Sequence, residues 1–260
     1  MAACAMLGMY DMPGVDTAND ALWAAIRAAL GHGPDRLTRD RDVWDIWRDP
    51  GLILAQTCGF PYRAQLHGTV HKLATPDYVL PDCPPGYYRS VFVVQSTSDM
   101  RELKDCSGRI FAFNDALSQS GWAAPQHALR SAGVQVGQLL ETGGHAASLA
   151  AVARGVADVT SVDLHSYRLL QHTGACPDNL RVIAQTDPTP SLPYICGLTQ
   201  DAGVIRAALT RALGTPGAEA LGLQGLVDIP DKTYLAVPTP PSPAQSRLPL
   251  RQLPPDHREL

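Results

Sequence analysis

The stretch Phe111-Ala-Phe-Asn-Asp-Ala-Leu-Ser-Gln-Ser-Gly-Trp122 decides the fold, because it leads from an apolar strand pattern into a helical one. The residue pattern predicts a strand over residues 109–114 and a helix over residues 120–132. Open α/β sheets bind their ligands at such junctions, beyond the carboxyl ends of the strands. The stretch therefore predicts an α/β domain with a ligand site at this turn.

The small polar residues of this turn indicate the charge of the ligand. Backbone N–H groups at the start of a helix, together with the helix dipole, attract a small anion. The hydroxyl groups of Ser118 and Ser120 would add hydrogen bonds, and Gly121 would let an oxyanion approach the backbone. We predict that residues 118–121, Gln119 included, bind a small oxyanion. The alternative is an ordinary serine cap before an amphipathic helix.

Two further junctions downstream carry polar residues. In Glu141-Thr-Gly-Gly-His-Ala-Ala-Ser148, the glycines give a flexible turn and His145 starts the next predicted helix, where it can donate to a ligand oxygen. In Ala157-Asp-Val-Thr-Ser-Val-Asp163, a strand leads to Asp163, which can accept from a ligand amine or hydroxyl. A structural role is the alternative at both, since a lone histidine is more often structural and Asp163 can equally cap the following helix.

Strand and helix patterns alternate along most of the chain, which implies parallel sheets flanked by helices. Two such series, one up to residue 95 and one after it, suggest two α/β lobes. In the first, residues 3–10 and 66–73 are predicted strands, and residues 17–30 are a predicted helix with Asp16 or Thr17 as N-cap. From Val237 onward, seven prolines in 24 residues predict an extended strap or a disordered end.

The composition argues against two classes of partner. The chain has a net charge of −4, a pI of about 6.0 and no basic stripe, so nucleic acid is not expected as a partner. No run approaches the roughly 18–20 apolar residues that span a bilayer, so direct membrane insertion is not expected. The apolar fraction of 45% is typical of a globular protein with a core, and a small anion needs only a local positive potential.

The first residues do not predict export. Residues 1–10 are mildly apolar, but no Lys or Arg precedes them, whereas a signal peptide has a charged leader and a small-residue cleavage site. As written, the chain is expected to be cytoplasmic. A signal peptide encoded upstream would make it periplasmic.

The cysteines and histidines predict neither a metal site nor covalent catalysis. The six cysteines have no C-x-x-C pair and no zinc-like spacing, so free thiols are expected, with Cys58–Cys83 as the bridge to test. On a strand, His67 and His71 would lie about 13 Å apart along the chain. Cys58 with His67 or His145 lacks an orienting third residue. No metal and no cofactor are expected.

The order of these motifs resembles a known family. Ser118-Gln-Ser-Gly121, Gly143-Gly-His145 and Gly155-Val-Ala-Asp-Val-Thr-Ser-Val-Asp163 follow one another as in the phosphonate- and phosphite-binding branch of the ABC-transporter solute-binding proteins. Gln56-Thr-Cys-Gly-Phe-Pro-Tyr62 is similar to the family's loop that brings a tyrosine to the cleft. Tyr88-Arg-Ser-Val-Phe-Val-Val resembles its strand leading to the second lobe. The resemblance spans roughly residues 5–230.

The resemblance implies an α/β, two-lobed, type II periplasmic-binding-protein-like fold. Each lobe would be a mostly parallel sheet flanked by helices, two hinge strands would join the lobes, and the ligand would be clamped between them. The expected domains are residues 1–93 plus 188–236 as a discontinuous lobe I, residues 94–187 as lobe II, and residues 237–260 as a Pro-rich C-terminal tail.

The resemblance also implies roles for individual residues. Ser118, Ser120 and Gly121 would hold the phosphoryl group or another oxyanion. His145 would contact the same group, Tyr62 would close over it, and Asp163 would read the other end of the ligand. Secondary candidates for ligand contacts are Thr57, Tyr88, Trp122, Ser148 and Tyr167.

We therefore expect a monomeric solute-binding protein that captures a phosphonate- or phosphate-like anion for uptake through an ABC-transporter permease. One alternative is an enzyme of cofactor biosynthesis on the same scaffold, with His145, Asp163 and Cys58 as candidate residues, and substrate conversion would reveal it. The other is a cytosolic sensor that reports the ligand through the proline-rich tail. For the sensor, deleting residues 237–260 would abolish partner capture but leave ligand binding intact.

Overall fold

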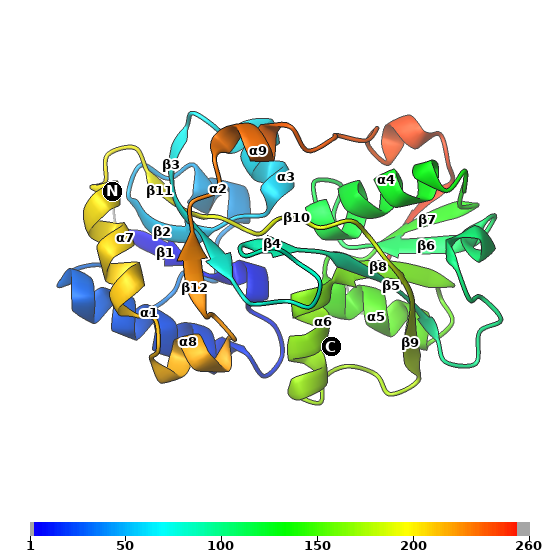
Figure 1. Ribbon diagram of the computed structural model, residues 1–260, viewed down its shortest axis with the longest axis horizontal. Coiled ribbons are helices and arrows are strands. Elements are labelled where there is room, and N and C mark those ends of the chain that lie inside the picture. Colours follow the sequence, from blue (N-terminus) through cyan, green and yellow to red (C-terminus); the bar gives the residue numbers. More distant parts are fainter. Residues whose placement is uncertain (1–2, 254–260) are drawn as a thin grey trace. The chain divides into compact units, whose positions relative to one another are not determined.

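The structure is a computed structural model that describes residues 3–253 (Figure 1). The chain forms two compact units. Unit 1 comprises the described residues up to Tyr87 together with Pro190–Ala236, and unit 2 comprises Tyr88–Thr189 together with the described residues from Val237 onward. Where the chain passes between the units, β4 (Tyr87–Tyr88) and β10 (Thr189–Pro190) form a two-stranded sheet. The C-terminal part of the chain therefore belongs to unit 2.

Unit 1 is built on a five-stranded mixed sheet in the order β1-β2-β11-β3-β12. β1 and β2 pair in parallel, whereas β11 lies antiparallel between β2 and β3, and β12 is antiparallel to β3. The sheet thus combines the N-terminal strands with two strands formed after the chain has returned from unit 2. The strands are β1 (Cys4–Met6), β2 (Leu52–Gln56), β3 (Val70–Asp77), β11 (Tyr194–Gly197) and β12 (Gly225–Val227).

The helices of unit 1 pack through apolar faces. α1 (Asp16–Leu30) buries Leu22, Trp23 and Ile26, and Gly31 ends it with a left-handed φ of 78°. α8 packs closely on α1, since a Cβ at Gly217 would lie 2.3 Å from the Leu22 backbone nitrogen. The helices after α1 are α2 (Val43–Trp47), α3 (Gly59–Pro61), the π-helical turn η2 (Tyr62–Leu66), α7 (Ala202–Arg211), α8 (Pro216–Ala220) and α9 (Asp231–Leu235).

Unit 2 is built on a six-stranded sheet in the order β13-β7-β6-β8-β5-β9. β13, β7, β6 and β8 are parallel neighbours, and β5 is antiparallel to both β8 and β9. The carboxyl ends of β7, β6 and β8 therefore lie at the same edge of the sheet. The strands are β5 (Ser90–Gln95), β6 (Ile110–Phe113), β7 (Gln138–Glu141), β8 (Val159–Asp163), β9 (Leu180–Gln185) and β13 (Leu250–Gln252).

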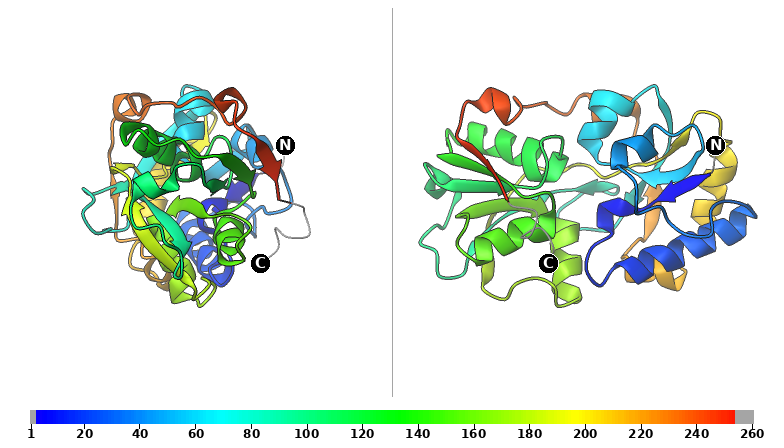
Figure 2. Two further views of the ribbon diagram at one scale, coloured as in Figure 1. Left: turned by 90° about the vertical axis from the view of Figure 1, so that its right-hand side faces the viewer. Right: turned by 180° about the vertical axis from the view of Figure 1, so that it is seen from behind.

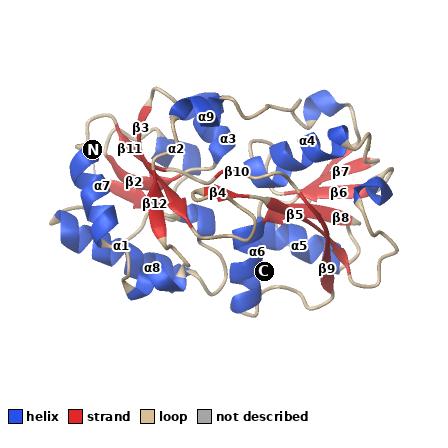
Figure 3. Cartoon of the chain, in the orientation of Figure 1, coloured by secondary structure: helices blue, strands red, loops and turns tan. Residues whose placement is uncertain are grey.

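Helices cover both faces of this sheet, with α4 on one side and α5 and α6 on the other (Figures 1 and 3). The first covering helix starts as the π-helical turn η4 (Gln119–Ala123) and continues as α4 (Ala124–Ser131). α5 (His145–Ala153) and α6 (Leu164–His172) follow β7 and β8. In each case a strand ends and a helix begins at the same edge of the sheet, after a short turn for η4 and α5 and directly for α6.

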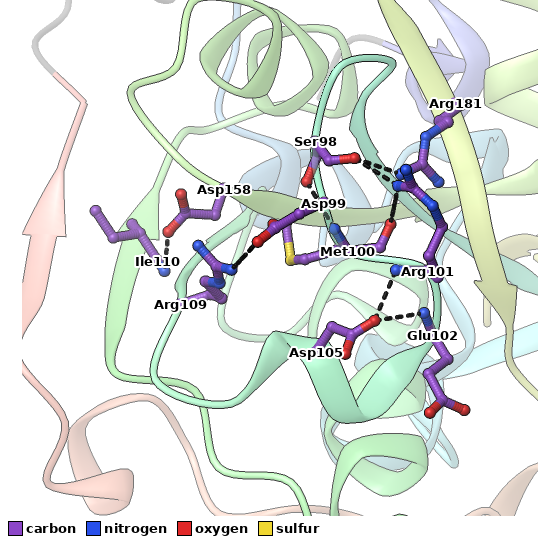
Figure 4. A network of polar contacts seen from close by, with 10 residues as sticks. All are labelled: Ser98, Asp99, Met100, Arg101, Glu102, Asp105, Arg109, Ile110, Asp158 and Arg181. Carbon is purple, nitrogen blue, oxygen red and sulfur yellow. Dashed lines mark hydrogen bonds and ion pairs between the residues drawn. The ribbon is translucent and has the colours of Figure 1, made fainter.

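The opposite end of the unit 2 sheet is held by a network of polar contacts (Figure 4). The short 3-10 helix η3 (Leu103–Cys106) contributes Asp105, whose carboxylate accepts from the backbone N–H groups of Arg101 and Glu102. Arg181 of β9 donates to the backbone carbonyls of Ser98 and Met100. These donors and acceptors satisfy one another, so the network stabilises the loop before β6.

Three predicted boundaries in unit 1 are wrong. The strand predicted over residues 3–10 ends at Met6, and the 3-10 turn η1 (Gly8–Tyr10) follows it. α1 begins at Asp16 with Val15 as N-cap and no side-chain cap, so neither Asp16 nor Thr17 is the cap. The strand predicted over residues 66–73 starts only at Val70, because η2 continues to Leu66 and a turn with a positive φ of 80° at Gly68 comes between them.

The part of the chain after unit 1, residues 237–253, is hereafter called the tail. It runs along unit 2, forms a 3-10 turn, η5 (Ala244–Ser246), and ends in β13, which pairs in parallel with β7 (Figure 2). Within residues 3–253, no helix has the length and apolarity needed to cross a membrane.

Candidate oxyanion site

The candidate site lies in unit 2, at the carboxyl ends of three neighbouring parallel strands. η4 follows β6, α5 follows β7, and α6 follows β8. Backbone bonds tie the first two turns together, because Thr142 N donates to Phe113 O and Gly143 N donates to Asn114 O, each at 2.9 Å. The predicted junctions at Ser118 and His145 are thereby brought side by side.

Ser118 is the N-cap of η4. Its backbone is extended, and its hydroxyl accepts from the Gly121 N–H at 3.0 Å. This is the ordinary serine cap that the sequence left open as the alternative. The cap uses the Gly121 amide, so Gly121 does not offer that N–H to a ligand.

Gly121 also has a different spatial role from the one predicted. A Cβ at this position would lie 1.8 Å from Asn114 Oδ1 and 3.3 Å from Ser118 Oγ. The space in front of Gly121 is therefore filled by the Asn114 amide. Glycine is required here for the approach of a side chain, whereas the sequence suggested the approach of an oxyanion.

Ser120 and His145 form the polar centre of the site. Ser120 Oγ lies 2.9 Å from His145 Nε2, which joins the first turn of η4 to the first residue of α5. Ser120 is 3% exposed, and its backbone carbonyl accepts from Ser161 Oγ of β8 at 3.1 Å. All three strand ends thus contribute to fixing the Ser120–His145 pair.

The imidazole of His145 is neutral near pH 7, because its burial lowers its pKa to about 4. Nε2 is engaged by Ser120, whereas Nδ1 is buried without a hydrogen-bond partner among the described residues. The Asn114 Oδ1 atom is likewise buried and has no hydrogen-bond partner among the described residues. Buried polar atoms without partners are costly, and they are a feature of sites where a ligand completes the set of hydrogen bonds.

The start of α5 is open. Gly144 is its N-cap, no side chain caps the first-turn N–H groups, and a Cβ at Gly144 would meet nothing within 4 Å. The N–H groups of a first helical turn have no partner inside the helix. Between the two turns, the open approach to the backbone is therefore at Gly144 and not at Gly121.

Ser148 stabilises the Thr142–Gly144 turn through its side chain. Its hydroxyl lies 2.6 Å from Thr142 Oγ1, which also lies 3.1 Å from the carbonyl oxygens of Phe113 and Gly144. Ser148 is fully buried, so this predicted secondary candidate fixes the Thr142–Gly144 turn in the structure.

Asp163 lies at the end of β8 and is 2% exposed. Its Oδ1 accepts from the backbone N–H groups of His165 at 2.6 Å and Ser166 at 3.2 Å, which makes it the N-cap of α6. Asp163 thus has the capping role that the sequence allowed beside a ligand contact.

The remaining candidates in unit 2 are buried. Trp122 is 1% exposed, its ring lies 5.0 Å from that of Phe113, and its indole N–H donates to Pro241 O at 3.1 Å. Burial, followed by a contact with Cys176, raises the pKa of Tyr167. Tyr88 is 1% exposed.

Tyr62 and Thr57 belong to unit 1. Tyr62 is 1% exposed, and its hydroxyl donates to Asp231 Oδ1 at 2.9 Å, while Lys72 Nζ lies 2.6 Å from the same oxygen. Burial and then the Asp231 contact raise the pKa of Tyr62 above its ordinary value. Thr57 is fully buried, and its N–H donates to Pro193 O.

The described residues contain no group of three or more His, Cys, Asp or Glu side chains that is suited to a metal ion. No disulfide joins Cys58 to Cys83, and all six cysteines, which lie within residues 3–253, are thiols.

Three residues that sequence reasoning did not select complete the site: Asn114, Thr142 and Ser161. Asn114 was noted only as the end of a strand, and Thr142 only as the residue before two glycines. A polar residue at the end of a parallel strand is a usable signal for the first two. Ser161 lies inside a buried strand, so its bond to Ser120 becomes visible only in the folded chain.

Comparisons with known proteins agree with this architecture. A family model described as "ABC transporter, phosphonate, periplasmic substrate-binding protein" matches residues 62–234. None of the curated protein sequences compared with the chain matches it.

Solved structures with similar folds share little sequence with the chain. The PhnD1 protein of Prochlorococcus marinus in complex with methylphosphonate has a TM-score of 0.74 and 15% identity, over 90% of this chain and 94% of that one. A binding-protein component of an ABC phosphonate transporter from Pseudomonas aeruginosa has a TM-score of 0.67 and 15% identity, over 90% and 82%. XAC2383 from Xanthomonas citri, bound to chloride, has a TM-score of 0.66 and 14% identity, over 91% and 95%.

The predicted fold class is thereby confirmed as that of the type II periplasmic binding proteins. The predicted function as a solute-binding protein is also confirmed, since this is a family of substrate-binding components and not of enzymes. The chain belongs to the periplasmic substrate-binding proteins of phosphonate ABC transporters.

Proposed function

We propose that unit 2 binds the oxyanion end of a phosphonate or phosphate at Ser120, His145 and the first turn of α5. Two first turns of helices meet there, and helix N-termini favour negative charge. The side chains at the centre of the site are neutral hydrogen-bond donors and acceptors. Such a site attracts an anion through oriented dipoles and does not require a charged side chain.

The observation that carries this proposal is that His145 Nδ1 is buried and has no hydrogen-bond partner among residues 3–253. The Nε2 atom is paired with the Ser120 hydroxyl, and the hydrogen bond at one ring nitrogen determines where the ring proton resides. The charged oxygens of an oxyanion accept hydrogen bonds. They would select the arrangement in which Ser120 donates to Nε2 and the Nδ1–H group donates to the anion.

The family supports a phosphorus oxyanion as the ligand. Methylphosphonate is bound by the similar PhnD1 protein, and it presents three oxygens and one methyl group. We propose the same ligand class for this chain. As a member of this family the chain has a small ligand and a transporter as partners, and we propose that it meets the permease as a monomer.

Calorimetric titration with methylphosphonate, phosphite and phosphate tests the proposal. The wild-type chain is compared with Ser120→Ala and His145→Phe, and the matched controls are Ser131→Ala and His127→Gln, at exposed positions of α4. His145→Phe removes a hydrogen bond to the charged ligand, which contributes about 1.5–3 kcal/mol. Ser120→Ala removes the bond that fixes the position of the ring proton on His145. Each site variant should therefore bind at least about tenfold more weakly.

In a parallel thermal-unfolding experiment, ligand at 100 times its dissociation constant should stabilise the wild-type chain by about 2.7 kcal/mol. Wild-type affinity retained by both site variants would contradict the proposed site. Silence of the wild-type chain toward all three anions would contradict the proposed ligand class.

A further inference from the structure

Two of the contacts that the tail makes with the rest of unit 2 lie beside the oxyanion site. The tail also bounds an open hollow of about 630 Å³, lined by Thr239, Pro240, Pro241, Ala244, Gln245 and Arg247. The hydrogen bond from η4 to the tail and the pairing of β13 with β7 form two attachments.

The first attachment is at Trp122, which directly follows Gly121 in η4. The indole N–H donates to Pro241 O at 3.1 Å, and the ring is 1% exposed and packs on Phe113 at the end of β6. A buried indole N–H requires an acceptor, and the tail provides it. The turn that carries Ser118 and Ser120 is thus fixed to the tail by its own tryptophan.

The second attachment is at β7, the strand that leads into the Gly143-Gly144 turn. β13 pairs with β7 in parallel, Leu139 N donates to Pro249 O at 2.8 Å, and Leu253 N donates to Glu141 O at 2.7 Å. Leu253 is 3% exposed and belongs to the apolar cluster that contains Ala147 and Ala151 of α5. The tail thus packs, through Leu253, against α5, the helix that begins with His145.

From these two attachments we propose that the tail is a brace. It positions η4 and α5, hereafter the two arms of the oxyanion site, and Trp122 is the positioning residue. The site itself rests on the proposed function above. Ser120 and His145 make their bond across the two arms, so its geometry depends on the relative placement of η4 and α5. The tail is bound to η4 through Trp122 and to α5 through β7 and Leu253. These contacts fix the position of η4 relative to α5.

The composition of the tail suits this role. Proline restricts the backbone of the unfolded chain, so ordering a proline-rich segment costs less conformational entropy. Such a segment is also stiffer than a glycine- or serine-rich linker of the same length. A strap that bridges two attachment points benefits from both properties.

The test compares Trp122→Phe with a matched control, Trp23→Phe. Trp23 is 2% exposed, and its indole N–H donates to Pro34 O at 3.0 Å, so the control loses the same kind of bond in unit 1. A chain truncated after Ala236 is the stronger perturbation. The point variants keep the test informative if the truncated chain does not fold.

Two readouts are measured. The first is the nitrogen NMR signal of His145 in the ligand-free protein, identified by its absence from His145→Phe, which reports the bond to Ser120. The second is the affinity for methylphosphonate. We expect Trp122→Phe to shift the His145 signal and to weaken binding about five- to tenfold, because one buried hydrogen bond is lost. Trp23→Phe should leave both unchanged, even where it lowers the melting temperature as much.

Each outcome bears on the brace. A His145 signal that is identical in Trp122→Phe and wild type would overturn it, and so would equal effects of the two tryptophan variants on that signal. If the wild-type chain binds no phosphorus oxyanion, the proposed function fails, but the ligand-free NMR comparison still decides whether the tail positions the arms.

Discussion

Gly121 and Gly144 each lie in a turn between a strand and a helix, yet their surroundings are opposite. At Gly121 an added methyl group would lie 1.8 Å from the Asn114 amide oxygen. At Gly144 it would meet nothing within 4 Å, and the φ of −163° is extended backbone that any residue adopts. One glycine is therefore needed for packing, and the other leaves a surface open.

Alanine substitutions separate these two roles. Gly121→Ala should lower the free energy of unfolding by about 1–3 kcal/mol, because Asn114 or the turn must move. Gly144→Ala should cost less than about 1 kcal/mol but weaken methylphosphonate binding at least about fivefold, because the methyl group occupies the approach to α5. Denaturant unfolding and calorimetric titration measure the two quantities.

The opposite pattern would contradict this reading of the site. If Gly121→Ala kept full stability and lost binding, the oxyanion would approach the backbone at Gly121, as the sequence alone suggests. Ser131→Ala, at the exposed end of α4, is a suitable control for both measurements.

At the scale of single residues, the sequence indicated positions more readily than contacts. Ser118, Ser120 and His145 were selected because they lie at strand-to-helix junctions, where α/β sheets bind ligands, and the structure brings Ser120 and His145 together. The role of Gly121 was missed because it depends on the rotamer of Asn114, seven residues earlier. No local pattern encodes such a contact.

At the scale of elements, α6 shows how a cap can resemble a ligand residue. Asp163 ends a buried strand and faces the same edge as the site, but its Oδ1 accepts from two N–H groups of its own helix. Aspartate and asparagine cap helices about equally well, whereas alanine does not. Substitution can therefore separate the capping role from a charge-dependent one.

We expect Asp163→Ala to lose about 1–2 kcal/mol of stability and Asp163→Asn to retain most of it, since an amide oxygen can replace the capping carboxylate. Methylphosphonate affinity should be unchanged in Asp163→Asn. A folded Asp163→Asn protein that binds methylphosphonate at least about tenfold more weakly would show instead that the carboxylate contributes to ligand binding. Thermal unfolding and titration of the same samples distinguish the two.

The long helices and most buried strands of this chain were predictable from their patterns, whereas several short elements were not. α1 carries a full amphipathic repeat and covers all of the predicted residues 17–30. β11, with four residues, and β12, with three, are too short for periodicity to mark them, and they form only because the sheet of unit 1 accepts them. η2 replaced the first part of a predicted strand because residues 62–66 close a helical turn.

At the scale of the whole molecule, the two α/β units were predictable because strand and helix patterns alternate in two series. The β13 strand of the tail was not predictable. Only three residues pair with β7, and the prolines before them indicate an extended or disordered segment instead of a strand. This affects the sensor alternative. Because the tail completes the sheet of unit 2, its removal should weaken ligand binding, whereas a detached sensor tail would leave binding intact.

The most direct test of the account is a crystal structure of the protein grown with methylphosphonate. Phosphonate oxygens should lie within about 2.6–3.2 Å of His145 Nδ1 and of a first-turn N–H of α5. A ligand bound elsewhere in the protein, with His145 Nδ1 still unpartnered, would contradict it.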